Sequence, residues 1–260
     1  MDELYKRQII NCDKILDKLS KNSINYKEIK HYYENALEMS LDYEMLQLLG
    51  LDTTLKENGE LFLNSRKNLL KDEVFCAVDI ESTDSISKGK IIEIGAVKLK
   101  NGEIIDEFSS LIYTDEVPEN ITELTGISTQ MLKNAPHSRK VLSDFRLFLK
   151  NSIFVAHNVA FDYGFLAKES LEYLNAPLIN QRLCTIMLAR RCIECDRYGL
   201  DSLKSELGID SIHHRALSDA RACAMVLWHC ILKLSNTNIK TSNDLIIFSK
   251  SKNTLKKLAE

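Results

Sequence analysis

Residues 74–81 read Val-Phe-Cys-Ala-Val-Asp-Ile-Glu and decide the fold class of the chain. The unbroken apolar run at 74–78 is typical of a strand that is buried on both faces of a sheet. Side chains alternate across a strand, so Asp79 and Glu81 are expected to share one face while Ile80 points to the opposite layer. Two carboxylates this close are unfavourable unless a cation lies between them. Acids at this spacing also arise by chance in a chain with 37 acidic residues, so the pair needs support from the rest of the sequence.

The sequence after this strand predicts a mixed α/β sheet. Residues 91–99 and 103–112 are rich in apolar side chains and are joined by the Asn-Gly turn at 101–102, which predicts two antiparallel neighbours. Residues 153–156 form a short buried strand that runs into a helical stretch, and residues 216–234 form a long helix with one apolar side. An antiparallel meander followed by strand–helix units is typical of a mixed α/β fold.

Two further acids stand where strands and helices meet. Asp162 is expected in the first turns of the helix after strand 153–156, where the end of a strand opens into a crevice. Asp219 is expected near the start of the last long helix, five positions after His214, which has His213 as its neighbour. For either acid alone, an equally good interpretation is that it complements the dipole at a helix N-terminus.

These segments resemble the motifs of the DEDD-type 3′-to-5′ exonucleases of the histidine subgroup. The resemblance covers about residues 74–232 and is greatest to the exonuclease domain of the proofreading (epsilon) subunit of bacterial DNA polymerase III. It implies a ribonuclease-H-like mixed sheet with flanking helices. The matching segments are Asp79-Ile80-Glu81, the stretch from His157 to Asp162 and the stretch from His214 to Asp219, with 93–98, 118–121, 124–128 and 203–209 also in the family's order.

The resemblance also implies a metal site. In this family four carboxylates, here those of Asp79, Glu81, Asp162 and Asp219, hold two divalent cations, Mg²⁺ or Mn²⁺. Oxygen ligands are what such hard cations require, and the cations would answer the repulsion between the clustered acids. The family's spacing selects His214 as the general base.

Five residues near these motifs are expected to contact the substrate. For His157 the alternative is a histidine at a strand end that hydrogen-bonds to the main chain. The predicted substrate-binding residues are Thr83, Leu124, His157, Asn158 and Phe161.

The chain is expected to have two further segments beside the exonuclease domain at 73–234. Residues 1–70 show three helical patterns and a hairpin signal at Asn58-Gly59, which resemble a small winged-helix-like α+β module. This segment holds 10 basic and 12 acidic residues, so packing or partner docking is favoured over DNA binding. Residues 235–260 are expected to form a basic, partly disordered C-terminal tail. Within it, residues 243–248 loosely resemble peptides that bind the sliding clamp, with an amphipathic helix end as the alternative.

The composition of the chain indicates the cellular compartment in which it works. No stretch approaches the 18 apolar residues of a membrane helix, and seven cysteines without an apolar leader at the N-terminus favour a reducing cytoplasm. Cys192 and Cys195 have the spacing of half a zinc site but lack a second pair, so ordinary reduced thiols are favoured. The net charge of -3 argues against a generally basic surface for nucleic acids, but two divalent cations would add four positive charges where phosphate must bind.

We therefore expect an enzyme that removes nucleotides from the single-stranded or frayed 3′ end of DNA, in replication proofreading. Its expected partners are the DNA polymerase III catalytic subunit and the sliding clamp, with no membrane. One alternative is a 3′-to-5′ exoribonuclease, because the motifs do not report whether a 2′-hydroxyl is recognised. Another is a non-catalytic docking protein, which retention of all four acids and His214 disfavours.

Overall fold

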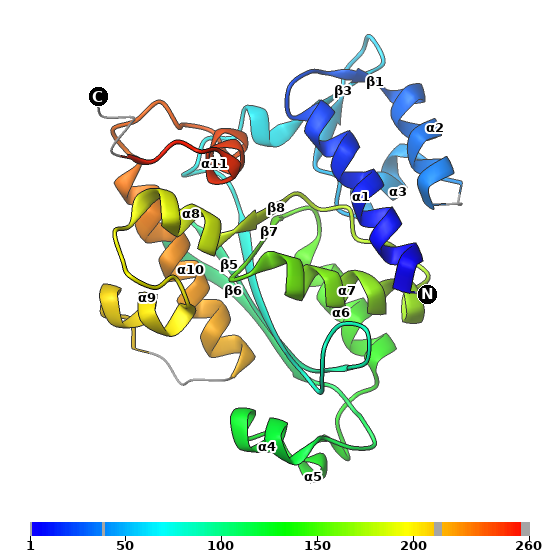
Figure 1. Ribbon diagram of the computed structural model, residues 1–260. Helices are drawn as coiled ribbons and strands as arrows, with labels where there is room; N and C mark the ends of the chain where they lie inside the picture. Colours follow the sequence, from blue (N-terminus) through cyan, green and yellow to red (C-terminus); the bar gives the residue numbers. More distant parts are fainter. Residues whose placement is uncertain (1, 38–39, 211–214, 256–260) are drawn as a thin grey trace.

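A mixed five-stranded sheet forms the centre of the computed structural model, which describes residues 2–37, 40–210 and 215–255 (Figure 1). The strand order is β6-β5-β4-β7-β8; β4, β5 and β6 are antiparallel neighbours, whereas β4, β7 and β8 run parallel. This confirms the predicted mixed sheet. The strands are β4 (Phe75–Ser82), β5 (Ile91–Lys100), β6 (Glu103–Leu111), β7 (Ile153–Ala156) and β8 (Arg182–Cys184).

The turn between β5 and β6 has the geometry that its sequence predicts. Asn101 and Gly102 both have positive φ, 49° and 85°, as a two-residue hairpin turn of Asn-Gly requires. The resulting hairpin sets β4 in the middle of the sheet, between β5 and β7. Strand β4 therefore has a strand on each edge, and residues 75–78 are buried as predicted.

Helices cover both faces of the sheet. Alternate residues of β4 belong to different cores, with Phe75 and Ala77 in one and Cys76, Val78 and Ile80 in the other. The first core is completed by α8 (Thr185–Cys192), α9 (Leu200–Leu207), α10 (Ala216–Lys233) and α11 (Ser242–Lys250), and the second by α6 (Ser138–Leu149) and α7 (Val159–Leu174). Two short helices, α4 (Glu119–Thr125) and α5 (Thr129–Leu132), lie at the lower end of Figure 1, beside a small apolar cluster of their own.

The N-terminal segment contains the elements that the sequence predicts. Its three strands form a small antiparallel sheet in the order β1-β3-β2. Ile179, from the segment before β8, is part of the same apolar core and donates its N–H to the carbonyl of Leu49. The assignment as a winged helix stays a prediction. The elements are α1 (Asp2–Leu19), β1 (Ile24–Asn25), α2 (Tyr26–Leu37), α3 (Tyr43–Leu48), β2 (Thr53–Leu55), β3 (Glu60–Leu63) and the short helix η1 (Asn64–Arg66).

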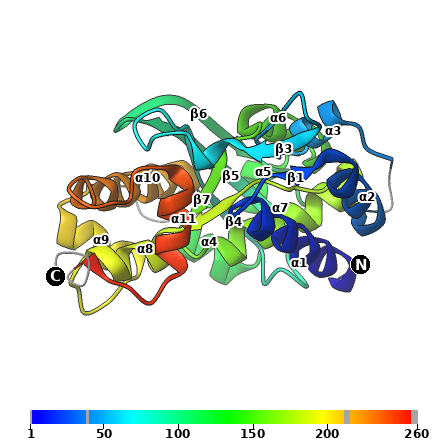
Figure 2. The ribbon, with the colours of Figure 1, turned by 90° about the horizontal axis from the view of Figure 1, so that it is seen from above.

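The segment after Leu234 is not a loose tail over its described part, so the expectation of disorder is wrong there. Helix α11 begins with a capping box in which the Thr241 and Asp244 side chains bond each other's backbone. Leu245 and Phe248 are buried in the same core as residues of α8 and α10. Figure 2 shows α11 beside these helices. The apolar run at 245–248 outweighs the basic composition of the segment, because burying it stabilises the packed helix.

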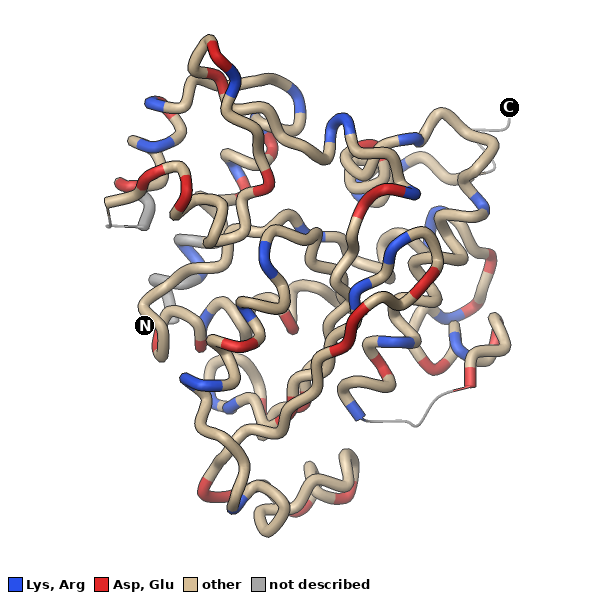
Figure 3. The backbone as a smooth tube through the Cα atoms, turned by 180° about the vertical axis from the view of Figure 1, so that it is seen from behind, with Lys and Arg blue, Asp and Glu red and all other residues tan. Residues whose placement is uncertain are grey.

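Two other sequence expectations can be compared with the structure. None of the described helices is long and apolar enough to cross a membrane. All seven cysteines are free thiols, and among the described residues neither Cys192 nor Cys195 belongs to a group that could hold a metal. Lysine and arginine are scattered over much of the fold among acidic residues, whereas helices α4 and α5 carry no basic side chain (Figure 3).

Candidate active site

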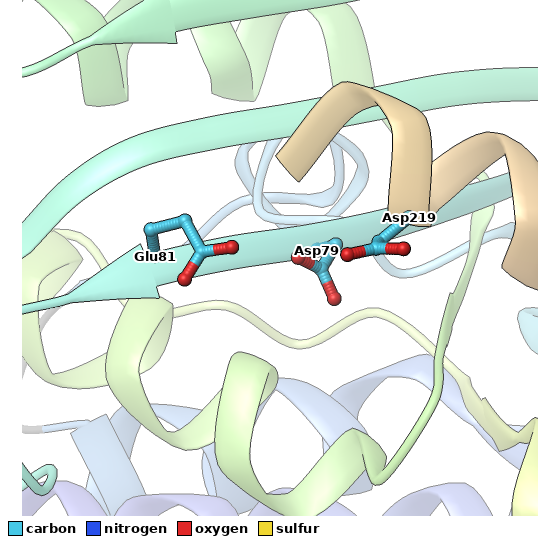
Figure 4. Close-up of side chains that lie close together, drawn as sticks. All are labelled: Asp79, Glu81 and Asp219. Carbon is cyan, nitrogen blue, oxygen red and sulfur yellow. The ribbon is translucent and has the colours of Figure 1, made fainter. Parts of the chain in front are cut away.

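Three predicted ligands meet above strand β4. Asp79, Glu81 and Asp219 each place one carboxylate oxygen within 4.8 Å of the others. Figure 4 shows Asp79 and Glu81 on the same face of β4, with Asp219 reaching them from α10. Ile80 lies in the core on the opposite face, so the alternation expected from the sequence is confirmed.

A glycine lets α10 come this close to the sheet. A Cβ atom on Gly95 of β5 would lie 2.1 Å from the backbone carbon of Ala216 and from the backbone nitrogen of Leu217. Any larger residue would therefore push the start of α10 away from the sheet. Because Asp219 lies in the first turn of α10, this contact sets its height above Asp79.

A buried acid fixes the same helix end. Glu93 of β5 is 1% exposed, and its carboxylate accepts hydrogen bonds from the guanidinium of Arg215 at 2.8 Å and from the N–H of Ala216 at 3.1 Å. A carboxylate at a helix N-terminus also complements the helix dipole. Glu93 lies directly opposite Glu81 in the β4–β5 register, so the anchor of α10 borders the acid cluster.

Asp162 is the fourth acid, and it comes from the first turn of α7. It is 3% exposed and lines a pocket of about 250 Å³ together with Asp79, Glu81 and Asp219. The chain enters α7 through Asn158, whose φ of 79° turns the backbone sharply after β7. The structure thus brings together all four acids that were predicted as ligands.

Burial and mutual repulsion perturb these acids. The pKa of Asp79 is raised well above its usual value by burial, and further by the charges of Asp162 and Glu81. Burial and the charge of Glu93 raise the pKa of Glu81 to about 7, and burial raises the pKa of Asp162 to about 8. Clustered carboxylates of this kind fit a hard divalent cation such as Mg²⁺ or Mn²⁺, which binds oxygen and offsets their charge.

The predicted substrate-binding residues fall into two groups. Asn158, Phe161 and His157 line the pocket, whereas Thr83 and Leu124 are not among its described lining residues. The hydroxyl of Thr83 accepts the N–H of Lys90 in the loop after β4, and Leu124 lies on α4 with 53% of its surface exposed.

His157 has partners for both ring nitrogens. Nδ1 lies 2.9 Å from the hydroxyl of Thr185, and Nε2 lies 2.9 Å from the carbonyl of Tyr198. Burial lowers its pKa, which favours the neutral ring. This geometry fits the alternative interpretation, a strand-end histidine bonded to the main chain, and contact with substrate stays a prediction. His213 and His214 lie outside the described residues.

Sequence analysis missed the roles of three residues beside the acids: Glu93, Arg215 and Lys204, which bonds Asp219. Glu93 is the lone charge in the apolar run 91–97, and a buried charge requires a partner. Lys204 occupies a helical position that the pattern of leucines assigns to the apolar side of α9. In both cases the sequence places a charged residue where an apolar side chain is expected.

The chain is similar in sequence to known proteins. A protein family described as "Exonuclease" matches residues 76–227. "DNA polymerase III PolC-type" of Clostridium perfringens (strain 13 / Type A) is 38% identical over 206 residues, which are 76% of this chain and 14% of that protein. The chain therefore spans only about a seventh of the length of that relative.

Solved structures share the fold. "Exonuclease X in complex with 5' overhanging duplex DNA" superposes with a TM-score of 0.56 at 22% identity, over 67% of this chain and 99% of that one. The nuclease domain of 3'hExo, described as a DEDDh family member bound to rAMP, gives 0.52 at 17% identity, over 62% and 92% of the two chains. At these identities the likeness shows a common ribonuclease-H-like exonuclease fold.

Proposed function

Because the chain belongs to the exonuclease family, we propose that it is a hydrolase that removes nucleotides one at a time from the 3′ end of DNA, in replication proofreading. The observation that carries the proposal is the convergence of four acids from β4, α7 and α10 in one pocket. A structural role does not explain them, since burial raises the pKa values of Asp79, Glu81 and Asp162. A cation site does, because bound cations favour the ionised carboxylates.

The four acids share one proposed role, that of metal ligands. Asp79, Glu81, Asp162 and Asp219 would hold two divalent cations, Mg²⁺ or Mn²⁺. When bound, such ions stabilise the charge that develops on the attacking and leaving oxygens of a phosphoryl transfer. The protein contributes the fixed carboxylates, and the contact of Gly95 with the start of α10 sets the height of Asp219 above the sheet.

His214 is proposed as the general base that takes a proton from the attacking water. An imidazole titrates near neutral pH and suits this role. In the sequence His214 directly precedes Arg215, whose guanidinium is anchored on the buried Glu93.

The pocket suits the end of a strand. Phe161 lines the pocket of about 250 Å³ with an aromatic ring on which a base can stack. Asn158 beside it offers a side-chain amide to the substrate. We propose a single-stranded or frayed 3′ end as the substrate, for which strand separation exposes the terminal phosphodiester.

Association with a DNA polymerase III catalytic chain is part of the proposal and is supported by the PolC-type relatives. Clamp binding through residues 243–248 has less support, because Leu245, Ile246 and Phe248 are buried and α11 would have to detach. A cytoplasmic location is also proposed, supported by the seven free thiols.

Digestion of 5′-labelled single-stranded DNA and RNA of matched sequence tests the proposal. With Mg²⁺ or Mn²⁺ we expect a ladder of shortened DNA that disappears in EDTA and in Asp79→Asn. Asp144→Asn, which removes an exposed acid of α6, is the matched control and should behave as the unmodified chain does. Faster shortening of RNA than of DNA would replace the proposal by an exoribonuclease, and no ladder on either polymer would refute it.

A further inference from the structure

Lys204 is a buried lysine in contact with the acid cluster. Its side chain is 4% exposed, and its ammonium donates to Oδ1 of Asp219 at 2.7 Å. The same ammonium lies 3.1 Å from Oδ1 of Asp201, one turn earlier in α9. Lysine is almost never fully buried unless its charge is paired, so these two carboxylates account for its burial.

The contact is unusual because Asp219 is also one of the three acids whose oxygens lie within 4.8 Å of one another. A carboxylate has two oxygens with about four acceptor positions, so Asp219 can bond Lys204 and still present an acceptor to Asp79 and Glu81. Lys204 therefore places a positive charge beside a group that, among the described residues, consists of the acids Asp79, Glu81 and Asp219.

Lys204 differs from Arg215, a second basic residue that the structure describes near the cluster. Arg215 is 43% exposed, and its guanidinium is paired with the buried carboxylate of Glu93, outside the group of three acids. Lys204 bonds directly to a member of that group and is shielded from water. Screening by solvent is weak for such a buried pair, so the charge of Lys204 acts strongly at short range.

We propose that Lys204 is a tethered cation of the site, which holds Asp219 in place before metal binds and weakens the binding of divalent cations to the cluster. The inference rests on the proposed function, because it assumes that the four acids form a cation site. The ammonium repels an incoming cation and also occupies part of the acceptor capacity of Asp219. The site would then fill at higher divalent cation concentrations than its four acids alone would require.

Titration with Mn²⁺, followed by the electron paramagnetic resonance signal of the free ion, tests this. Lys204→Met keeps an unbranched side chain, one atom shorter, and removes the charge, so we expect Mn²⁺ to bind at least about tenfold more tightly. In EDTA the same variant should melt at a lower temperature, because Asp219 loses its partner, and the rise in melting temperature on adding Mn²⁺ should be larger than in the unmodified chain. Lys204→Arg, which keeps the charge, and Lys140→Met, which removes an exposed lysine, should both retain the unmodified affinity.

The outcomes separate the possibilities. Weaker Mn²⁺ binding in Lys204→Met would mean that the lysine prepares Asp219 for the metal, and unchanged affinity with a lower melting temperature would mean a structural role alone; either result overturns the inference. Lys204→Gln provides the same test if the methionine variant does not fold, since its amide still donates to Asp219. If the unmodified chain binds no Mn²⁺, or if Asp79→Asn leaves its Mn²⁺ binding unchanged, the proposed function itself fails. That result is distinct from the two that overturn the inference about Lys204.

Discussion

Gly95→Ala is the substitution that best tests how the fold positions the site. Gly95 lies in the middle of β5, where the start of α10 rests on the strand. The added Cβ would meet backbone atoms of Ala216 and Leu217 at 2.1 Å, and neither can move without moving the helix. Asp219, in the first turn of α10, must follow any such movement.

The size of the effect follows from the contact distance. Ordinary contacts begin at 3.4 Å, so the start of α10 would have to retreat by about 1.3 Å. Overpacking of this kind costs about 1–3 kcal/mol of stability. Misplacing a catalytic group by about 1 Å costs about 100-fold in rate, so we expect activity to fall by at least this factor while most of the protein stays folded.

Urea denaturation and the rate of shortening of a 5′-labelled DNA strand measure the two effects. Gly199→Ala is the matched control, because a Cβ atom there meets nothing within 4 Å; it should change stability by less than about 1 kcal/mol and leave the rate unchanged. A folded Gly95→Ala variant with the unmodified rate would refute the conclusion that this glycine sets the position of Asp219.

Three further predictions concern stability. The pKa of Glu81 is raised from 4.5 to about 7 by burial and neighbouring acids, so the folded chain binds this proton more tightly than the unfolded chain; in EDTA the melting temperature should fall as pH rises from about 5 to about 8, and a flat profile would contradict the repulsion. Asp162→Asn removes a carboxyl group whose pKa is raised to about 8 by burial. At pH 8 in EDTA, calorimetry should therefore find the variant at least as stable as the unmodified chain, whereas a clear loss of stability would assign Asp162 a structural role. In urea denaturation, Leu245→Ala should lower the free energy of unfolding by about 2–5 kcal/mol. Ile247 on the same helix is 47% exposed, so Ile247→Ala should lower it by less than about 1 kcal/mol, and equal small effects would mean that α11 is detachable.

The four acids were predicted as ligands through the resemblance to the exonuclease motifs, because neither the spacing of Asp79 and Glu81 nor the helix positions of Asp162 and Asp219 is decisive alone. Asp79 and Glu81 follow an apolar run within β4, and Asp162 and Asp219 stand in the first turns of helices. The mixed sheet was equally accessible, since the Asn-Gly turn at 101–102 fixes the β5–β6 hairpin. Local patterns thus predict where a side chain lies on its own strand or helix, whereas the motif resemblance supplied the role of the acids.

Residues whose role depends on a distant partner were missed. Glu93 and Arg215 are 122 positions apart, and only the packing of α10 on β5 brings them together. Lys204 similarly needs the contact between α9 and α10 to reach Asp219. Their charges resembled ordinary surface charges because the sequence does not state what lies opposite them.

The C-terminal segment was misjudged for a related reason. Its lysines dominate its composition, whereas the structure is decided by a short apolar run at 245–248 that the core accepts. Whether such a run is buried depends on a complementary surface, to which α8, β8 and η1 contribute here. The average composition of the segment does not reveal an apolar run of four residues.

The most direct measurement compares DNA labelled at its 3′ end with DNA labelled at its 5′ end, with Mn²⁺, for the unmodified chain and Asp162→Asn. We predict that the unmodified chain releases labelled mononucleotide from the 3′-labelled strand at the first cleavage, while the 5′-labelled strand shortens stepwise. Asp162→Asn should do neither at a comparable rate, because the site loses a ligand. Internal cuts, release from the 5′ end, or an unchanged rate in Asp162→Asn would contradict a 3′-to-5′ exonuclease built on these four acids.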